Sequence, residues 1–298
     1  MKTNLVTVLG PTAVGKTSIA AKLAKDFSGE VISADSRQVY RQMNIGTGKD
    51  LEEIKSRRID YHLIDIVEPT EEYNLFRFKN DFYSAFRLIN EKNKLPILVG
   101  GTGLYLSSIL QNYDLRKAEK DQSETLKKLS VQELREILIA LRPEQHNTTD
   151  LIEKERLIKA IQIAMVSNQN NYSSSFPEIK SLNIGITDSR EKIKKRITTR
   201  LKQRLKNGMI EEVESLLKII DHKKLQFFGL EYKYISLYLL GELNYNDMFQ
   251  RLNSSIHNFA KRQMTWFRKM EKEGVKINWF EPDEIEKIRN FLKSELKK

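Results

Sequence analysis

The feature that most constrains the fold is the stretch GPTAVGKT at residues 10–17, which lies between an apolar run and an amphipathic helical pattern. Gly10 is followed by four residues and then by Gly15, Lys16 and Thr17, which is the spacing of a phosphate-binding loop. The preceding LVTVL is typical of a buried strand. Backbone N–H groups of such a loop, together with the positive end of the following helix, hold a diphosphate or triphosphate. The loop therefore predicts phosphate binding and leaves the reaction open.

Strand and helix patterns alternate along the first hundred residues. Strands are expected at 5–9, 30–34, 61–67 and 95–101, helices at 15–27 and 76–92, and a further strand at 181–187. This order predicts an α/β fold with a P-loop NTPase-like core, in which helices flank a parallel sheet. Ligands of such sheets bind beyond the carboxyl ends of the strands. We therefore expect the phosphate loop, Asp35 and the glycines of 100–103 to meet at one edge.

The chain is expected to contain one core and one insertion. Residues 114–179 are polar and mostly helical, with helices expected at 123–141 and 150–166. They predict a helical insertion into a catalytic core made of 1–113 and 180–298. The last part of this core is expected to form helices at 190–206, 209–220, 230–240 and 245–271.

The net charge of +11 is unevenly distributed. Residues 1–179 hold 25 Lys and Arg against 24 Asp and Glu, whereas residues 180–298 hold 26 against 16. A basic segment of this kind favours a polyanionic partner, nucleic acid first. A solvated lysine-rich surface is the alternative that charge alone leaves open.

Several classes of protein are disfavoured by composition. The chain has no cysteine, and its four histidines are scattered without the spacing of a zinc site. No apolar run approaches the ~20 residues that a membrane helix needs. The sequence begins directly with a strand and shows no export signal, so we expect a cytoplasmic protein without membrane association.

Candidate catalytic groups follow from their places at strand ends. Lys16 adds a point charge to the phosphate loop, and the Thr17 hydroxyl is placed to bind Mg²⁺. Asp35, after the second strand, is a candidate general base, although an Asp there could instead cap a turn. Ser36, Arg37 and Gln38 could recognise an acceptor.

The tract VGGTGLY (99–105) lets the backbone approach a ligand closely, or forms a tight turn that needs small residues, and Thr102 adds a hydroxyl. No acidic residue ends the apolar run ILVGG, and Asp65 is the nearest substitute, at a position where an Asp is more often structural. A motor ATPase or a GTPase is therefore disfavoured.

Five blocks occur in a characteristic order: GPTAVGKT, SADSRQVYRQMNIGTGK, YHLIDI, ILVGGTGLYL and AKRQMTWFRK. In this order they resemble the tRNA dimethylallyltransferase family, also called tRNA isopentenyltransferases, over nearly the whole chain. The resemblance implies transfer of a dimethylallyl group from dimethylallyl diphosphate to N6 of the adenosine on the 3′ side of the tRNA anticodon. The products are isopentenyladenosine and diphosphate, so the phosphate that the loop holds is the leaving group.

The resemblance also implies roles for individual residues, with Mg²⁺ as cofactor and Asp35, Lys16 and Thr17 as catalytic groups. The donor diphosphate is expected at Gly10, Pro11, Thr12, Ala13, Val14, Gly15, Lys16 and Thr17. Contacts with the tRNA are expected from Asp35, Ser36, Arg37, Gln38, Thr102, Arg156, Lys261, Arg262 and Arg268. The insertion is expected to contact the anticodon stem-loop, where His146 also matches loosely, and the chain to act as a monomer. Trp266 and Phe267 are expected in the core because they continue an apolar helical stripe with Phe259.

The chain departs from the family pattern at three places. Leu230 stands where the family usually has a tyrosine, and Ile256-His257-Asn258 replaces Thr-Arg-Gln. In the insertion, Lys159 and Gln162 replace an Arg and a Glu. Because the donor and base motifs are intact, we expect an active enzyme with a shifted or weakened tRNA preference.

Three other interpretations stay open at this stage. A small-molecule or nucleotide kinase shares the loop and the base but does not need a basic last third. An isopentenyltransferase acting on free adenine nucleotides could dispense with much of the insertion. A non-catalytic RNA-binding protein with a relict loop is disfavoured by the intact Lys16, Thr17 and Asp35.

Overall fold

The computed structural model describes residues 3–113, 126–127, 129–141, 154, 157–158, 160–161 and 176–297. The chain divides into two compact units. The larger consists of Met1–Asn112 with Glu178–Lys298, and the smaller of Tyr113–Pro177.

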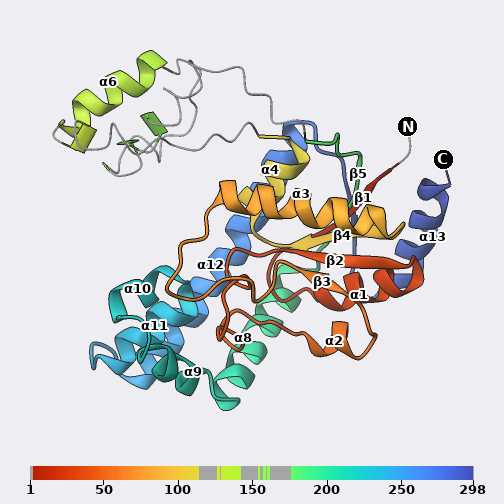
Figure 1. Cartoon of the computed structure of the whole chain (residues 1–298). Helices are drawn as coiled ribbons and strands as arrows, with labels where there is room; N and C mark the ends of the chain where they lie inside the picture. The colour runs from red at the N-terminus through yellow and green to blue at the C-terminus, as the bar shows by residue number, and fades with distance from the viewer. Residues whose placement is uncertain are drawn as a thin grey trace. The chain divides into compact units, whose positions relative to one another are not determined.

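A six-stranded parallel sheet forms the centre of the larger unit (Figure 1). Its strands are β1 (Leu5–Leu9), β2 (Gly29–Ala34), β3 (Tyr61–His62), β4 (Leu95–Gly100), β5 (Ser181–Ile186) and β6 (Ile277–Phe280). They are arranged in the order β3-β2-β4-β1-β5-β6. The predicted α/β fold with a parallel sheet is therefore confirmed, and the sheet gains one strand, β6, that the sequence pattern did not reveal.

The strand predicted at 61–67 is wrong in extent, since β3 ends at His62. Leu63 and Asp65 have φ angles of 61° and 56°, which no strand residue adopts. Asp65 turns toward Lys49, whose buried ammonium lies 2.5 Å from the Asp65 carboxylate. This ion pair gives Asp65 a structural role.

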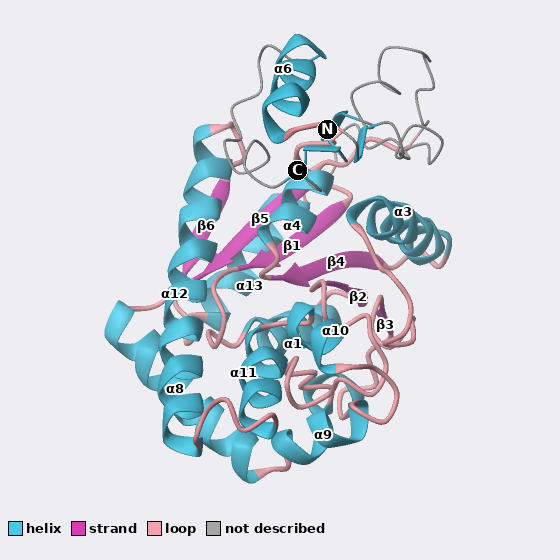
Figure 2. Cartoon of the chain, turned by 90° about the vertical axis from the view of Figure 1, so that its left-hand side faces the viewer, coloured by secondary structure: helices cyan, strands magenta, loops and turns pink. Residues whose placement is uncertain are grey.

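Helices cover both faces of the sheet (Figure 2). The helix α1 (Lys16–Asp26) packs on one face, where Val6 and Val8 join its apolar side in a single cluster. The other face lies under α3 (Leu75–Glu91) and α4 (Gly103–Leu110), whose Phe78 and Tyr105 rings stack with centroids 4.0 Å apart. Because side chains alternate along β1, Leu5 and Leu9 point toward this second layer.

The last third of the chain is largely helical. It contains α8 (Arg190–Lys206), α9 (Met209–Leu216), α10 (His222–Phe227), α11 (Leu230–Leu239), α12 (Tyr245–Lys272) and α13 (Ile285–Leu296). The predicted helix at 209–220 ends early, at Leu216. The short helices α2 (Glu52–Lys55) and α10, as well as α4 and α13, were not predicted. In α8, Ile193, Ile197 and Leu201 are buried on one stripe and anchor the helix, while most of its Lys and Arg side chains are exposed.

In the smaller unit, α6 (Val131–Leu141) forms the later part of the helix expected at 123–141. Its Leu134 and Leu138 pack with Leu157 and Ile161 in a separate apolar cluster. Most of the helix expected at 150–166 lies outside the described residues. No helix in the described part of the chain is long and apolar enough to cross a membrane.

Candidate functional site

Three loops meet at the carboxyl edge of the sheet. They follow β1, β2 and β4, which are neighbours in the order β2-β4-β1. Here the structure forms a cavity of about 320 Å³. Its lining comprises Thr12, Ala13, Gly15, Lys16, Thr17, Ser18, Ser33, Asp35, Gln38, Thr47, Gly48, Asp50, Glu53, Val99, Gly100, Gly101, Arg200, Phe259 and Gln263. The expected convergence of the phosphate loop, Asp35 and the tract after β4 is confirmed.

The phosphate loop runs from Gly10 to Thr17 and leads directly into α1. Gly15 has a φ of 81°, a left-handed conformation that favours glycine, and α1 begins at Lys16. The Lys16 ammonium donates to the Pro11 carbonyl at 2.6 Å, and the Thr17 hydroxyl belongs to the cavity wall. Val14 is buried, and it packs in the apolar core instead of lining the cavity. The N-terminal end of α1 therefore points its free N–H groups toward the cavity.

Arg200 is a functional candidate that sequence reasoning missed. It comes from α8, lines the same cavity as Lys16, and donates from its guanidinium to the Thr12 hydroxyl. Burial and then the Arg200 charge lower the pKa of Lys16 to about 7, against a smaller opposing effect of Asp35. Burial and then Arg204 lower the pKa of Arg200 to about 10. Because the two buried cations repel each other, an anion bound near both of them would be stabilised. A diphosphate is such an anion.

Gln263 is the second residue that the sequence pattern did not reveal. Its side-chain oxygen accepts the Thr12 N–H at 2.8 Å, and its amide donates to the Gly101 carbonyl at 2.8 Å. A Cβ on Gly101 would lie 2.5 Å from the Gln263 amide nitrogen, so this approach needs a glycine. Through Gln263, the helix α12 fixes the phosphate loop and the loop after β4 relative to each other.

Asp35 occupies the cavity wall and also closes a turn. One of its carboxylate oxygens accepts the Arg37 N–H at 2.9 Å, which leaves the other for a ligand. Gln38 lines the cavity as well, and donates to the Gly48 carbonyl at 3.2 Å. The Thr102 hydroxyl accepts the Ser36 N–H at 3.3 Å and so ties the loop after β4 to the loop after β2. Asp35 therefore closes a turn and also lines the cavity, and its role as general base stays a prediction.

Arg37 connects this loop to the segment around Leu230. Its guanidinium donates to the Phe228 carbonyl, and the Phe228 ring packs edge-on against Tyr40 at 4.7 Å. Leu230 itself packs against the apolar core.

The tyrosines that follow Leu230 are also engaged. Tyr232 is buried and donates to the Glu212 carboxylate at 2.8 Å, and the Tyr234 hydroxyl lies 2.8 Å from that of Ser255. Both hydroxyls therefore have internal partners, and neither is a free substitute for the tyrosine that Leu230 replaces.

The basic block at the end of α12 is distributed over several faces of the helix. Lys261 and Arg268 line a second cavity, described below, while the Arg262 guanidinium lies 5.9 Å from the centroid of Phe259. Phe267 is fully buried, and Trp266 is half-buried, donating from its indole to the Ser107 hydroxyl at 2.8 Å.

The expected core position is therefore confirmed for Phe267, whereas Trp266 is only half-buried. The prediction for Phe259 is wrong, because this ring is 39% exposed and lines the phosphate cavity. The apolar period placed it beside the core residues without showing that the cavity opens there. Arg156, His146, Lys159 and Gln162 lie outside the described residues.

The donor set of the cavity fits a hard divalent cation. The Thr17 hydroxyl and the Asp35 carboxylate supply oxygen atoms, and Asp50 and Glu53 line the same space. Mg²⁺ prefers such ligands and usually completes its shell with water and substrate phosphate. Among the described residues, no group of three or more His, Cys, Asp or Glu could hold a metal ion. A magnesium ion here would therefore complete its shell with water and with phosphate oxygens of a ligand.

Comparison with known proteins shows which chains share this arrangement. A family model described as IPP transferase matches residues 38–270, and one described as isopentenyl transferase matches residues 3–65. A tRNA dimethylallyltransferase 1 from Syntrophus aciditrophicus is 46% identical over 304 residues, covering 100% of both chains. Another from Azobacteroides pseudotrichonymphae is 50% identical, covering 97% of this chain and 96% of its own.

A solved structure agrees over the same length. The full-length tRNA isopentenylpyrophosphate transferase of Bacillus halodurans superposes with a TM-score of 0.73 at 33% identity. The match covers 99% of this chain and 97% of that one. The likeness therefore extends over the sheet, its loops and the helical last third.

Proposed function

The chain belongs to the IPP transferase family, and we propose that it transfers a dimethylallyl group from dimethylallyl diphosphate to N6 of a tRNA adenosine. The adenosine is the one on the 3′ side of the anticodon. The observation that carries this proposal is one cavity lined by Lys16, Arg200 and Asp35 together with Val99 and Phe259. Cations can bind the diphosphate, apolar side chains can contact the allylic group, and a carboxylate can accept the proton of the attacking amine.

The phosphate loop and Arg200 bind the donor diphosphate, with the free N–H groups at the start of α1. Negative charge builds on the diphosphate as the bond between the allylic carbon and its oxygen breaks. Lys16 and Arg200 lie where they stabilise this charge, and their burial strengthens the interaction. The apolar side chains of Val99 and Phe259 offer a surface for the dimethylallyl group.

The adenosine N6 supplies the electron pair for the new carbon–nitrogen bond. The amine then carries one proton too many, and Asp35 accepts it through the carboxylate oxygen that the turn leaves free. Diphosphate leaves with the electrons of the broken carbon–oxygen bond, so atoms and charge balance. Bound Mg²⁺, held at Thr17, would neutralise part of the diphosphate charge.

Recognition of the tRNA is assigned to the loops around this cavity and to the basic last third. The adenine must leave its stack to reach the cavity. Ser36, Arg37, Gln38 and Thr102 form the loops at which it would arrive. Lys261, Arg262 and Arg268, together with the insertion at 114–179 and its Arg156, are proposed to contact the anticodon arm. We further propose that the chain works as a monomer in the cytoplasm.

Mass spectrometry of nuclease-digested tRNA tests the reaction directly. The purified protein is incubated with Mg²⁺, dimethylallyl diphosphate and unmodified tRNA, and the digest is examined for isopentenyladenosine. Parallel reactions with adenosine monophosphate distinguish a tRNA acceptor from a free nucleotide. Absence of product from tRNA, in a protein that still binds diphosphate, would refute the proposed function.

Asp35→Asn separates the role of the base from that of the turn. The asparagine oxygen can still accept the Arg37 N–H, whereas the proton acceptor is lost. Because general bases typically contribute 10²–10⁴-fold, we expect kcat to fall by about that factor with diphosphate affinity nearly unchanged. Asp283→Asn, at an exposed carboxylate outside the cavity, is the matched control.

A further inference from the structure

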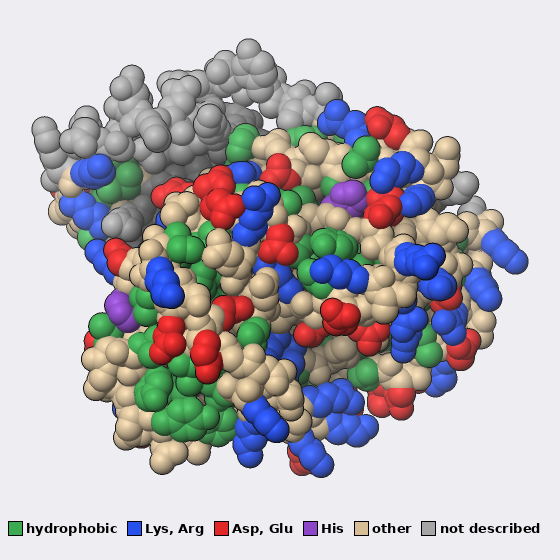
Figure 3. Space-filling view, turned by 60° about the horizontal axis from the view of Figure 1, so that its bottom comes forward, with side chains coloured by type: hydrophobic (Ala, Val, Ile, Leu, Met, Phe, Trp, Pro, Cys, Tyr) green, Lys and Arg blue, Asp and Glu red, His purple; other side chains and the backbone are tan. Residues whose placement is uncertain are grey.

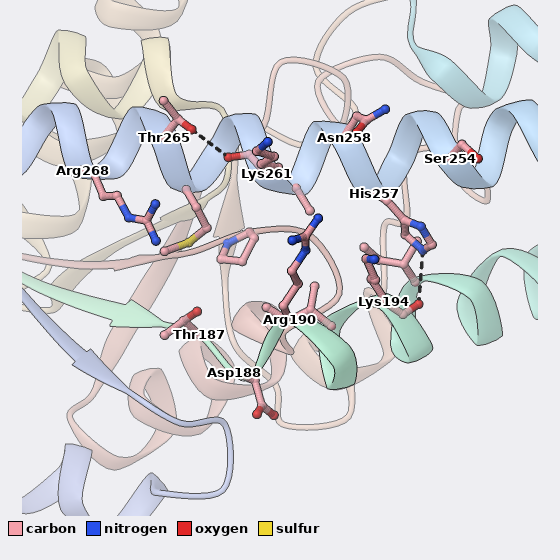
Figure 4. Close-up of a pocket in the computed structure, with 15 residues that line it drawn as sticks. Thr187, Asp188, Arg190, Lys194, Ser254, His257, Asn258, Lys261, Thr265 and Arg268 are labelled. Carbon is pink, nitrogen blue, oxygen red and sulfur yellow. Dashed lines mark hydrogen bonds between the residues drawn. The ribbon is translucent and has the colours of Figure 1, made fainter.

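A second and larger cavity, of about 570 Å³, lies between the start of α8 and the middle of α12 (Figure 4). We call it the α8–α12 groove. Pro11 of the phosphate loop borders it, but the groove opens on a different side of α12 from the phosphate cavity. Phe259 and Gln263 face the phosphate cavity, whereas Lys261 and Arg268 face the groove. At 100° per residue, these two pairs lie on opposite faces of the helix.

The groove carries uncompensated positive charge. Arg190 and Lys194 line it from α8, and Lys261 and Arg268 line it from α12. Arg190 projects from α8 toward α12 in Figure 4. None of these four side chains forms an ion pair with any residue in the described part of the chain.

Asp188, the one carboxylate among the described residues that line the groove, does not neutralise these four charges. Its side chain is 3% exposed and already pairs with Lys192 at 3.3 Å and with Arg196 at 2.8 Å. The groove therefore keeps an excess of four cations, which repel one another unless an anion enters.

The shape of the groove favours a chain of anions over a single small ion. Lys261 and Arg268 are seven residues apart, which is about 10 Å along the axis of α12. One phosphate group placed beside Lys261 would thus leave Arg268 unsatisfied. Between the charges the floor is apolar, formed by Ile193, Ile197 and Met264. Spaced cations over an apolar floor suit a phosphodiester backbone with its sugars.

Basic and acidic side chains are mixed on one face of the molecule. On the face shown in Figure 3, Lys and Arg side chains lie beside Asp and Glu over most of the surface. All residues that line the groove, except Pro11, come from residues 180–298, the segment that holds nearly all of the positive excess.

We infer that the α8–α12 groove binds the phosphodiester backbone of the tRNA, with Arg190 and Lys194 as contacts in addition to Lys261 and Arg268. This inference rests on the proposed function, because it adds contacts for the same tRNA substrate. His257 also lines the groove, and its Nε2 lies 3.3 Å from the Lys194 carbonyl, which fixes the imidazole beside the cations. Backbone docked here would touch α12, the helix whose opposite face holds the phosphate loop through Gln263.

Paired variants on α8 test the inference. Arg190→Ala with Lys194→Ala removes two charges from the groove. Lys195→Ala with Lys202→Ala removes two charges from the same helix at exposed positions outside it. The affinity for unmodified tRNA is measured by filter binding at several salt concentrations, and the affinity for inorganic diphosphate by calorimetry. Circular dichroism confirms that each variant folds.

The groove variant is expected to bind tRNA about tenfold more weakly or worse, with the log–log salt slope reduced by about 1.4–1.8. The control pair should change much less, and both should keep wild-type affinity for diphosphate. Exchanging the two residues, Arg190→Lys with Lys194→Arg, should restore most of the affinity.

Equal losses in the groove and control variants would overturn the inference, since they would show a diffuse effect of net charge. A parallel loss of diphosphate affinity in the groove variant would overturn it as well, by assigning the groove to the donor. Failure of the proposed function looks different. In that case the wild-type protein itself makes no isopentenyladenosine, whatever the groove variants bind.

Discussion

Replacing Gln263 with methionine tests how far α12 controls the donor site. Methionine has nearly the same length and keeps the packing, but it removes both hydrogen bonds of the Gln263 side chain. The Thr12 N–H and the Gly101 carbonyl would lose their 2.8 Å partners at a position where Gln263 is only 7% exposed. An unsatisfied buried polar group costs about 1–3 kcal/mol. The two groups together thus predict a loss of about 2–6 kcal/mol, divided between stability and the shape of the loop.

The expected result follows from that division. If about 1.4 kcal/mol of the loss falls on the loop geometry, the affinity for inorganic diphosphate drops about tenfold. The remainder lowers the free energy of unfolding. Isothermal calorimetry measures the first quantity and denaturant unfolding the second. Both are measured without tRNA, so that effects on the acceptor do not enter.

A matched substitution controls for the loss of a glutamine as such. Gln203 on α8 is exposed and donates to Asn207 at 3.0 Å, so Gln203→Met should change neither quantity measurably. Wild-type diphosphate affinity together with wild-type stability in Gln263→Met would refute the reasoning. It would show that Thr12 and Gly101 keep their geometry without α12.

Four further predictions concern the site and its supports. Since an anion raises the lowered pKa of Lys16, diphosphate affinity should fall as pH rises through about 7; a calorimetric series that is flat from pH 6 to 9 would contradict this. Without a bound anion, Lys16 has a pKa of about 7 in the folded chain and about 10.5 in the unfolded chain. Between these values the unfolded chain binds more protons, so Lys16 makes the free energy of unfolding increase with pH. Glu212→Ala removes the acceptor of three backbone N–H groups at 44–46. It should lower the free energy of unfolding, measured in urea titrations, by about 3 kcal/mol. An unchanged midpoint would show that water replaces the carboxylate. Gly103→Ala places a Cβ 2.4 Å from the Trp266 indole and should shift tryptophan fluorescence and lower the melting temperature, whereas an unchanged spectrum would mean that the ring moves without cost.

The sequence was informative about the site where the chemistry is local. The phosphate loop, Asp35 and the tract at 99–105 each follow a strand whose apolar pattern is visible, and parallel strands bring such ends together. The structure confirms that the three meet in one cavity. Each of these features depends on neighbouring residues in the chain, so a short window of sequence contains the whole signal.

Arg200 and Gln263 could not be found in that way. Arg200 is one of nine Lys or Arg residues in α8, and the helical period alone does not say which of them faces a ligand. Its partner Thr12 is 188 positions away, and Gln263 is 251 positions from the same residue. Their roles come from how α8 and α12 pack around the sheet. The same holds for the segment after β3, where Asp65 pairs with Lys49 from another part of the chain.

Thr12 shows why the basic last third and the donor site cannot be treated as separate parts. Its hydroxyl accepts from Arg200 of α8, and its N–H donates to Gln263 of α12. Both contacts come from residues 180–298, the basic segment whose charge favours a polyanionic partner. The proposed RNA contacts lie on one face of α12, and Gln263 holds the phosphate loop from the other. A shift of α12 would move the Gln263 oxygen that accepts the Thr12 N–H, and this would couple the two substrates. The geometry of the phosphate loop thus depends on residues from the opposite end of the chain.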